Sequence, residues 1–138
     1  MNSGKTSKDA TLRKGTGTIL VIDDEPAVRD VSKLFLEQNG FQVLAAEDGM
    51  RALQLYHEHG PKIVLVLLDM TMPGMNGDEV FRALRGFRPD LPIILSSGYS
   101  EQETMQLLDN SAHSSFIKKP YRPKALLDKV FNFLALRG

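Results

Sequence analysis

Residues 62–77 read Lys-Ile-Val-Leu-Val-Leu-Leu-Asp-Met-Thr-Met-Pro-Gly-Met-Asn-Gly, and this stretch decides the fold. Its apolar residues from Ile63 to Leu68 do not alternate with polar ones, which is typical of a strand buried on both faces of a parallel sheet. The run ends at Asp69, and a loop rich in glycine and proline follows. Open α/β folds place their ligand sites at the carboxyl edge of the sheet, where such a residue lies. Asp69 is therefore the first candidate for the chemistry.

The composition is that of a single globular domain. A chain of 138 residues is long enough to bury roughly 70% of the surface of its unfolded state. The absence of cysteine excludes thiol catalysis, disulfide frameworks and zinc fingers. The longest apolar run is far shorter than a membrane-spanning helix, and the sequence does not open with a signal-peptide pattern. These features predict a soluble cytoplasmic domain that makes no membrane contact.

Charge is unevenly distributed, although the formal net charge is zero. Residues 1–17 hold four basic residues and one acidic residue, so they carry +3 and the remainder carries −3. They are rich in small polar residues and have too little apolar surface to order themselves, which predicts a flexible tail or linker before a domain at 18–138. Nucleic-acid surfaces rely on clustered lysine and arginine, so the folded part is not expected to bind nucleic acid.

From residue 18 onward, short apolar strands alternate with amphipathic helices. Strands are expected at 18–22, 41–46, 63–68, 91–95 and 115–117. Helices are expected from Pro26 to the Asn39-Gly40 stop, from Asp48 to Gly60-Pro61, from Asn76 or Gly77 to Gly86, from Ser100 to about Asn110, and from Pro123 onward. Right-handed crossovers convert this alternation into one five-stranded parallel sheet with helices on both faces, a doubly wound α/β domain.

Polar residues end these strands and would meet at one edge of the sheet: Asp23, Asp24, Asp69, Ser97 and Lys119. Three crowded carboxylates repel one another, which favours raised pKa values or a counter-cation, and Mg²⁺ suits hard oxygen ligands with few protein donors. A site with Mg²⁺, one lysine and one hydroxyl suits transfer of a phosphoryl group onto a carboxylate. Asp69 would be the nucleophile and form an aspartyl phosphate, and Ser97 would hydrogen-bond a phosphoryl oxygen.

Four segments of the chain resemble the receiver domain of two-component response regulators. They are Val-Ile-Asp-Asp-Glu-Pro (21–26), Leu-Leu-Asp-Met-Thr-Met-Pro-Gly-Met-Asn-Gly (67–77), Ser-Ser-Gly-Tyr-Ser (96–100) and Lys-Lys-Pro-Tyr (118–121). The resemblance covers about residues 18–137, and the four motifs stand in the family's order. It implies a flavodoxin-like fold with the strand order 2-1-3-4-5.

The resemblance also implies a role for each matching position. Asp69 matches the phosphorylated aspartate, and Asp23 and Asp24 match the acidic pair that holds Mg²⁺ directly or through water. Thr71 matches the residue whose backbone carbonyl binds the metal. Lys119 matches the lysine that contacts the phosphate. A protein with these roles is a phosphoprotein of signal transduction, limited to self-phosphorylation and self-dephosphorylation, and not an enzyme acting on other substrates.

Two further positions match the residues that transmit phosphorylation in the family. Ser97 matches the switch serine or threonine, and Phe116 matches the aromatic switch, where phenylalanine lacks the hydroxyl of tyrosine. In the family these side chains remodel a face made by the fourth helix, the fifth strand and the fifth helix, here about residues 101–110, 115–117 and the helix from Pro123. The implied phosphodonor is a histidine kinase or a histidine phosphotransfer domain.

Residues 98–100 and 119–123 are similar to receivers attached to the C-terminus of hybrid histidine kinases. That placement would make residues 1–17 the end of an interdomain linker, with attached kinase domains as partners. A stand-alone receiver that relays phosphate to a downstream protein in a phosphorelay fits the same residues.

Three alternative functions remain for comparison. Residues 67–71 are similar to the phosphorylated motif of haloacid-dehalogenase phosphatases, but those enzymes need a second aspartate two residues later, where Thr71 stands. A flavodoxin-like nucleotide or flavin binder would need a glycine-rich or hydroxyl-rich phosphate loop after the first strand. A phosphate-independent interaction module on the same fold is the third alternative.

Several residues near the site have simpler expected roles. Glu25 would offset the dipole of the helix that begins at Pro26. Asp23 or Asp24 could also cap that helix. The methionines at 70, 72 and 75 are expected to pack the loop after the central strand and not to bind a cofactor.

Overall fold

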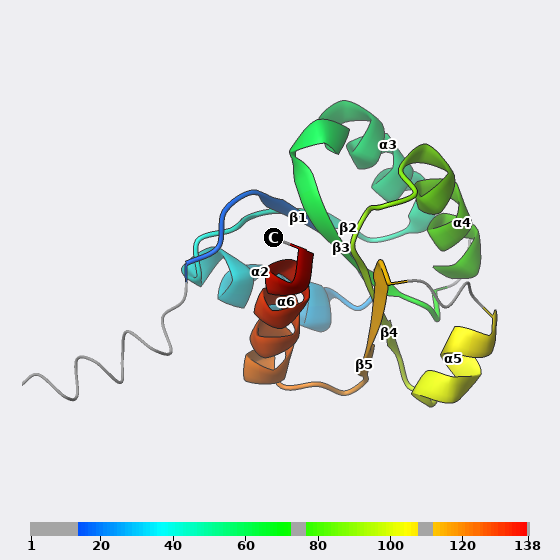
Figure 1. Cartoon of the computed structure of the whole chain (residues 1–138). Helices are drawn as coiled ribbons and strands as arrows, with labels where there is room; N and C mark the ends of the chain where they lie inside the picture. Colours follow the sequence, from blue (N-terminus) through cyan, green and yellow to red (C-terminus); the bar gives the residue numbers. More distant parts are fainter. Residues whose placement is uncertain (1–13, 73–76, 108–111, 138) are drawn as a thin grey trace, which may run out of the picture.

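The computed structural model describes residues 14–72, 77–107 and 112–137 (Figure 1). In chain order its elements are β1 (Thr18–Ile22), α2 (Pro26–Gln38), β2 (Gln42–Ala46), α3 (Gly49–His59), the 3-10 turn η1 (Gly60–Lys62), β3 (Ile63–Asp69), α4 (Gly77–Phe87), β4 (Ile93–Ser97), α5 (Glu101–Leu107), β5 (Ser114–Lys118) and α6 (Pro123–Arg137). The predicted alternation of strands and helices is confirmed. None of the helices within the described ranges is long and apolar enough to cross a membrane.

The strands form one parallel sheet in the order β2-β1-β3-β4-β5, as expected. The register pairs Ile22 with Leu68 and Asp69 with Ser96. The carboxyl ends of β1, β3 and β4 therefore meet at one edge of the sheet. The residues that follow or end these strands are brought together there, although they are far apart in the sequence.

Two layers of helices enclose the sheet (Figure 1). Leu20 and Ile22 of β1 pack with side chains of α3 and α4 in one core cluster. Ile19 and Val21, which point to the opposite face, pack with α2 and α6 in a second cluster. Both faces of the central strands must be apolar because both are covered, which explains their unbroken hydrophobic runs.

Local sequence signals set the starts of several helices. The Asp48 carboxylate accepts a hydrogen bond from the Arg51 amide at 2.8 Å and caps α3. At the start of α5, the Ser100 hydroxyl accepts from the Glu103 amide, and the Glu103 carboxylate accepts from the Ser100 amide. This reciprocal arrangement is a capping box. These helix starts were predicted correctly because the signal lies within one turn of the chain.

The strand β4 differs from its expected position, since it covers Ile93–Ser97 and not residues 91–95. The Ile93 amide donates to the His113 carbonyl, so pairing with β5 begins there. Leu91 is buried before the strand begins. Ser97 is consequently the last strand residue. The expected end of α5 near residue 110 lies outside the described residues.

Residues 14–17 lie against the turn between α2 and β2. The Gly15 amide donates to the Asn39 carbonyl at 2.6 Å, and the Gln42 amide donates to the Gly17 carbonyl at 3.0 Å. A β-carbon at Gly15 would overlap the ring of Phe41, so this close approach requires glycine. Residues 1–13 lie outside the described part, and the boundary between tail and domain at 17/18 stays a prediction.

Candidate functional site

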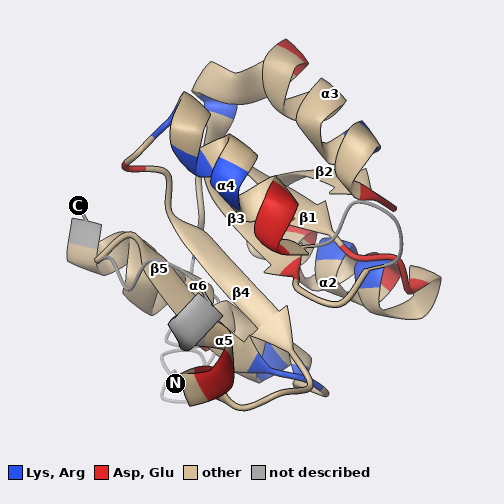
Figure 2. Cartoon of the chain, turned by 90° about the vertical axis from the view of Figure 1, so that its right-hand side faces the viewer, with Lys and Arg blue, Asp and Glu red and all other residues tan. Residues whose placement is uncertain are grey.

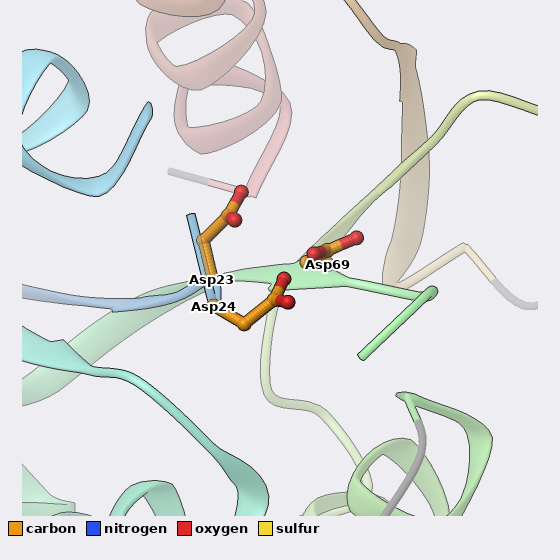
Figure 3. Close-up of side chains that lie close together, drawn as sticks. All are labelled: Asp23, Asp24 and Asp69. Carbon is orange, nitrogen blue, oxygen red and sulfur yellow. The ribbon is translucent and has the colours of Figure 1, made fainter. Parts of the chain in front are cut away.

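Three aspartates meet at the carboxyl edge of the sheet. Asp23 and Asp24 follow β1, and Asp69 ends β3. One carboxylate oxygen from each lies within 4.8 Å of the others, and Figure 3 shows Asp24 directing its carboxylate toward Asp69. Asp23 is 2% exposed and Asp69 is 1% exposed. The predicted juxtaposition is present, with two of the three carboxyl groups almost fully removed from bulk water.

A turn before α2 fixes Asp23. The Glu25 amide donates to Asp23 Oδ1 at 2.9 Å, and Arg29 Nη1 donates to the Asp23 carbonyl at 2.7 Å. The N-cap of α2 is Glu25, and its side chain makes no capping bond. The expectation that Asp23 or Asp24 caps α2 is therefore wrong. Asp23 instead orders the turn that brings its own carboxylate toward the centre of the site.

Asp69 is held by the residues that follow it. The backbone amide and the hydroxyl of Thr71 both donate to Asp69 Oδ1, each at 3.1 Å. The start of α4 packs directly behind this turn: a β-carbon at Gly77 would lie 2.8 Å from the Asp69 carbonyl oxygen. The same sequence that ends the strand thus also orients the carboxylate. Sequence reasoning assigned only the backbone carbonyl of Thr71 a role, and missed its hydroxyl.

Lys119 reaches the acidic cluster from the end of β5. Its amide donates to the Ser97 carbonyl at 2.8 Å, which places the residue beside β4. Its ammonium nitrogen lies 3.0 Å from Asp23 Oδ2 and 3.5 Å from Asp69 Oδ2, with the side chain 13% exposed. Lys118, which precedes it, is exposed. The expectation that Lys119 meets the aspartates at this edge of the sheet is confirmed.

Glu25 provides the shortest ion pair of Lys119. Its Oε1 lies 2.8 Å from the ammonium nitrogen. Glu25 stands at the N-cap of α2, where it was expected to offset the helix dipole, and the contact with Lys119 is a further role that this expectation did not include. The only sequence signal was its position directly after the acidic pair, and a contact across 94 residues cannot be read from that position alone.

The charges of the site shift the pKa values of its members. Burial raises the pKa of Asp23 above its ordinary value, and the bonds from the Glu25 amide and Lys119 offset only part of that effect. Burial, a hydrogen bond to Asp69 and the charge of Asp69 raise the pKa of Asp24. Burial alone would lower the pKa of Lys119, but its bonds to Glu25 and Asp23 and the charge of Asp69 raise it.

More negative charge surrounds this edge. Acidic residues stand in the first turns of α4 and α5, where they favour the helix dipoles: Asp78, Glu79, Glu101 and Glu103. Both turns appear red in Figure 2. The cluster contains one lysine and three aspartates, so the charge of the lysine alone does not balance that of the carboxylates. Three carboxylates offer oxygen ligands that lie within 4.8 Å of one another, and the pKa values of Asp23 and Asp24 are raised. These features fit a hard divalent cation held by carboxylate oxygens.

The expected switch residues occupy neighbouring strands. Ser97 is fully buried, and its Oγ accepts a hydrogen bond from the Tyr99 amide at 3.0 Å. A cavity of about 430 Å³ lies beside it, lined in part by Thr71, Tyr99 and Thr104. Phe116 is buried in the core cluster that contains the α3 and α4 side chains. Met72 is buried in the same cluster, as expected for loop packing, and Met75 lies outside the described residues.

Sequence reasoning also missed a hydrogen bond beside the site. The hydroxyl groups of Ser32 in α2 and Tyr121 in the loop after Lys119 lie 3.1 Å apart. An open cavity of about 580 Å³ runs alongside them, between Val28 and Val31 of α2 and Leu126 of α6. The apolar spacing along residues 26–38 predicted that helix, but not which of its polar residues would meet the loop.

A model of the response regulator receiver domain matches residues 19–131. The chain is 35% identical over 130 residues to the sensor kinase CckA of Brucella abortus, covering 94% of this chain and 14% of that protein. It is 35% identical over 112 residues to the DNA-binding response regulator MtrA of Mycolicibacterium smegmatis, covering 81% of this chain and 48% of that protein.

Solved structures of receiver domains also resemble this chain. The receiver domain of the hybrid histidine kinase CckA superposes with a TM-score of 0.72 at 33% identity, covering 86% of this chain and 99% of that one. The chain thus spans less than half the length of the two curated relatives named above, but nearly all of a solved receiver domain. Neither a dehalogenase-type phosphatase nor a flavin binder is favoured, and the Thr71 hydroxyl that stands in place of the second acid donates to Asp69.

Proposed function

This chain belongs to the response regulator receiver domain family of two-component signalling, and from that premise we propose that Asp69 is its phosphoacceptor. The donor is the phosphohistidine of a histidine kinase or of a histidine phosphotransfer domain. The observation that carries the proposal is the position of Asp69: it is 1% exposed at the end of β3, oriented by Thr71 and faced by Lys119.

The proposed reaction is an in-line transfer onto a carboxylate. An oxygen of Asp69 attacks the phosphorus, the bond from phosphorus to the imidazole nitrogen breaks, and an aspartyl phosphate and a free histidine result. The Lys119 ammonium offsets negative charge on the phosphoryl oxygens. Hydrolysis of the same aspartyl phosphate resets the site. The chain is thus a signalling module whose own chemistry is confined to self-phosphorylation and self-dephosphorylation.

Asp23, Asp24 and Asp69 would hold Mg²⁺, together with the backbone carbonyl of Thr71. Their oxygens form a hard donor set with few protein ligands, which suits Mg²⁺. When bound, the ion would reduce the electrostatic repulsion between the negatively charged carboxylates and the negatively charged phosphoryl group. Asp23 and Asp24 therefore serve as ligands, while Asp69 serves as ligand and nucleophile.

Phosphorylation would be transmitted through Ser97 and Phe116. The Ser97 hydroxyl would leave the Tyr99 amide for a phosphoryl oxygen. Phe116 is already buried, so phosphorylation would hold its ring in this inward position and not turn it there. The new charge would thus shift a pre-existing equilibrium on the face formed by α5, β5 and α6. A downstream protein, or attached kinase domains of a hybrid histidine kinase, would read that face.

We further propose a cytoplasmic domain that contacts other proteins and neither nucleic acid nor membrane. The acidic side chains around the site and in the first turns of α4 and α5 disfavour a polyanion there. MtrA is a DNA-binding response regulator, but this chain matches only 48% of it. The cytoplasmic location follows the kinases and regulators that such receivers serve.

The experiment that tests this function is an intact-mass measurement after incubation with acetyl phosphate. A single phosphoryl adduct should form with Mg²⁺, and it should disappear with a chelator or in Asp69→Asn. The variant should keep its fold, because asparagine has nearly the same shape. If no adduct forms, and beryllofluoride also fails to bind, the domain would be a phosphate-independent interaction module on the same fold.

A further inference from the structure

We propose that Ser32 and Tyr121 are positioning residues of the phosphotransfer reaction. The hydrogen bond between their hydroxyl groups holds Lys119 within reach of a phosphoryl group on Asp69. This inference rests on the proposed phosphoacceptor function, and it assigns a role to two residues that are not among the expected phosphoacceptor, metal or switch residues.

The loop that carries Lys119 has an anchor on either side of this residue. On one side, the Lys119 amide donates to the Ser97 carbonyl at 2.8 Å, at the end of β4. On the other side, the Tyr121 hydroxyl oxygen lies 3.1 Å from that of Ser32, which is 2% exposed in α2. The main chain of Lys119 is therefore held between a strand and a helix, and the second anchor is a single hydrogen bond between two side chains.

Close packing does not hold this loop on the side that faces α2. Lys119, Pro120 and Tyr121 line the open cavity of about 580 Å³ between α2 and α6. The Tyr121 ring packs against the core cluster that contains side chains of α2 and α6, but these apolar contacts are not directional. Empty space beside a side chain removes contacts that would otherwise fix it. A directional hydrogen bond therefore has more influence on this loop than it would have in a filled core.

The ion pairs of Lys119 do not replace this anchor during phosphotransfer. Its ammonium nitrogen lies 3.0 Å from Asp23 Oδ2 and 3.5 Å from Asp69 Oδ2. The same two carboxylates are the proposed Mg²⁺ ligands, and a phosphoryl group would take one oxygen of Asp69. Both attractions to Lys119 are weaker in that state, because the charge of each carboxylate is shared with another group. The reach of Lys119 toward the phosphoryl oxygens then depends on where its main chain is held.

Helix α2 holds Asp23 as well as this loop. Arg29 Nη1 donates to the Asp23 carbonyl at 2.7 Å. Arg29 and Ser32 are three residues apart in the helix, so they are adjacent on its surface. The helix therefore sets the distance between Asp23 and the main chain of Lys119. Loss of the Tyr121 bond should displace Lys119 alone, because Asp23 keeps its bond to Arg29.

Tyr121→Phe and the double variant Ser32→Ala/Tyr121→Phe separate positioning from stability. The single variant leaves the buried Ser32 hydroxyl without this partner, whereas the double variant removes both hydroxyl groups and should recover most of the lost stability. In the presence of Mg²⁺, both variants should bind beryllofluoride roughly three- to tenfold more weakly, measured by calorimetry, because the charge-assisted hydrogen bond from Lys119 is weakened. Their affinity for Mg²⁺ alone should equal that of the wild-type protein.

Ser32→Thr and Asn39→Ala are the matched controls, and both should bind beryllofluoride as tightly as the wild-type protein. Threonine keeps the hydroxyl group, and its additional methyl group has room because Ser32 lines the open cavity. Asn39→Ala removes the hydrogen bond from Asn39 Nδ2 to the Phe35 carbonyl, 2.9 Å long, at the far end of α2. It therefore weakens the same helix away from the site.

Three results would overturn the proposal. The first is a wild-type affinity of the double variant for beryllofluoride, which would show that only stability had changed. The second is an equal loss of affinity for Mg²⁺, which would show that the whole acidic cluster had moved. The third is an equal loss of affinity for beryllofluoride in Asn39→Ala.

A second readout needs no phosphoryl mimic. Hydrogen exchange of the Lys119 amide, followed by NMR, should be severalfold faster in the double variant, because the loop has lost one of its anchors. Ser32→Thr should leave the exchange rate unchanged. An unaltered rate in the double variant would contradict the proposal. Failure of the wild-type protein to bind beryllofluoride would count against the proposed function alone, because hydrogen exchange still decides whether the bond holds Lys119.

Discussion

The hydroxyl oxygens of Ser32 and Tyr121 lie 3.1 Å apart and join α2 to the loop after Lys119, across 89 positions of sequence. Ser32 is almost completely buried, and burial raises the pKa of Tyr121 above its ordinary value. The helix that starts beside Glu25 is thereby fastened to the loop that starts beside Lys119. The bond thus helps to keep the two partners of the ion pair in reach of each other.

Tyr121→Phe should destabilise the domain, because it leaves the buried Ser32 hydroxyl without this partner. The expected loss in the free energy of unfolding is roughly 1–3 kcal/mol, measured by urea denaturation. Tyr99→Phe is the matched control. Tyr99 is 61% exposed, so the loss of its hydroxyl group should change the free energy of unfolding only slightly. Equal losses in the two variants would contradict the assigned role of the bond.

Gly77→Ala should destabilise the domain and slow its phosphorylation. A β-carbon at this position would lie 2.5 Å from the Met70 α-carbon and 2.8 Å from the Asp69 carbonyl oxygen, and neither backbone atom can yield as a side chain would. Overpacking of this kind typically costs roughly 1–3 kcal/mol. Displacing α4 would also disturb Asp69. Denaturation and the rate of acetyl phosphate labelling measure the two effects.

Gly86 provides the control in the same helix. A β-carbon there would meet no atom within 4 Å. Gly86→Ala should therefore raise the free energy of unfolding, by roughly 0.4–1 kcal/mol, because alanine restricts the unfolded chain more than glycine does. A destabilisation of similar size in both variants would contradict the role of the close backbone approach at Gly77.

Adding Mg²⁺ should stabilise the folded domain, because the carboxylates of the site are assembled only in the folded state. At a Mg²⁺ concentration about a hundredfold above the dissociation constant, the expected gain is about 2.7 kcal/mol. Thermal unfolding with Mg²⁺ and with a chelator measures this gain. Asp23→Asn should reduce it strongly, whereas Asp30→Asn should leave it intact. A gain that survives in Asp23→Asn would place the ion elsewhere.

Without divalent ions, the free energy of unfolding of the domain should depend on pH through the titration of Asp24. Its pKa is raised above the ordinary 3.8, so the folded state binds this proton more tightly than the unfolded state does. The contribution of Asp24 is therefore most favourable below pH 3.8 and is lost as pH rises through the raised value. Asp24→Asn should be more stable than wild type above that window, with no such gain below it. A pH-independent difference between the two proteins would argue against this coupling.

The sequence by itself determined the elements and the edge at which the chemistry gathers. Unbroken apolar runs such as Ile63–Leu68 occur where both faces of a strand are covered, and local signals such as Asp48 and Ser100 start helices within one turn. The aspartates could be placed together because parallel strands end at a common edge. Strand order was different: it came from the family resemblance, since no local pattern encodes which strand neighbours which.

Only the tertiary structure decided the contacts between distant elements. The pairing of Ile93 with the carbonyl of His113 shifts β4, because a strand begins where its neighbour offers bonds and not where apolar residues begin. The ion pair of Glu25 with Lys119 depends on the reach of two long side chains from different elements. Such reach is a property of the folded arrangement, and no spacing along the chain contains it.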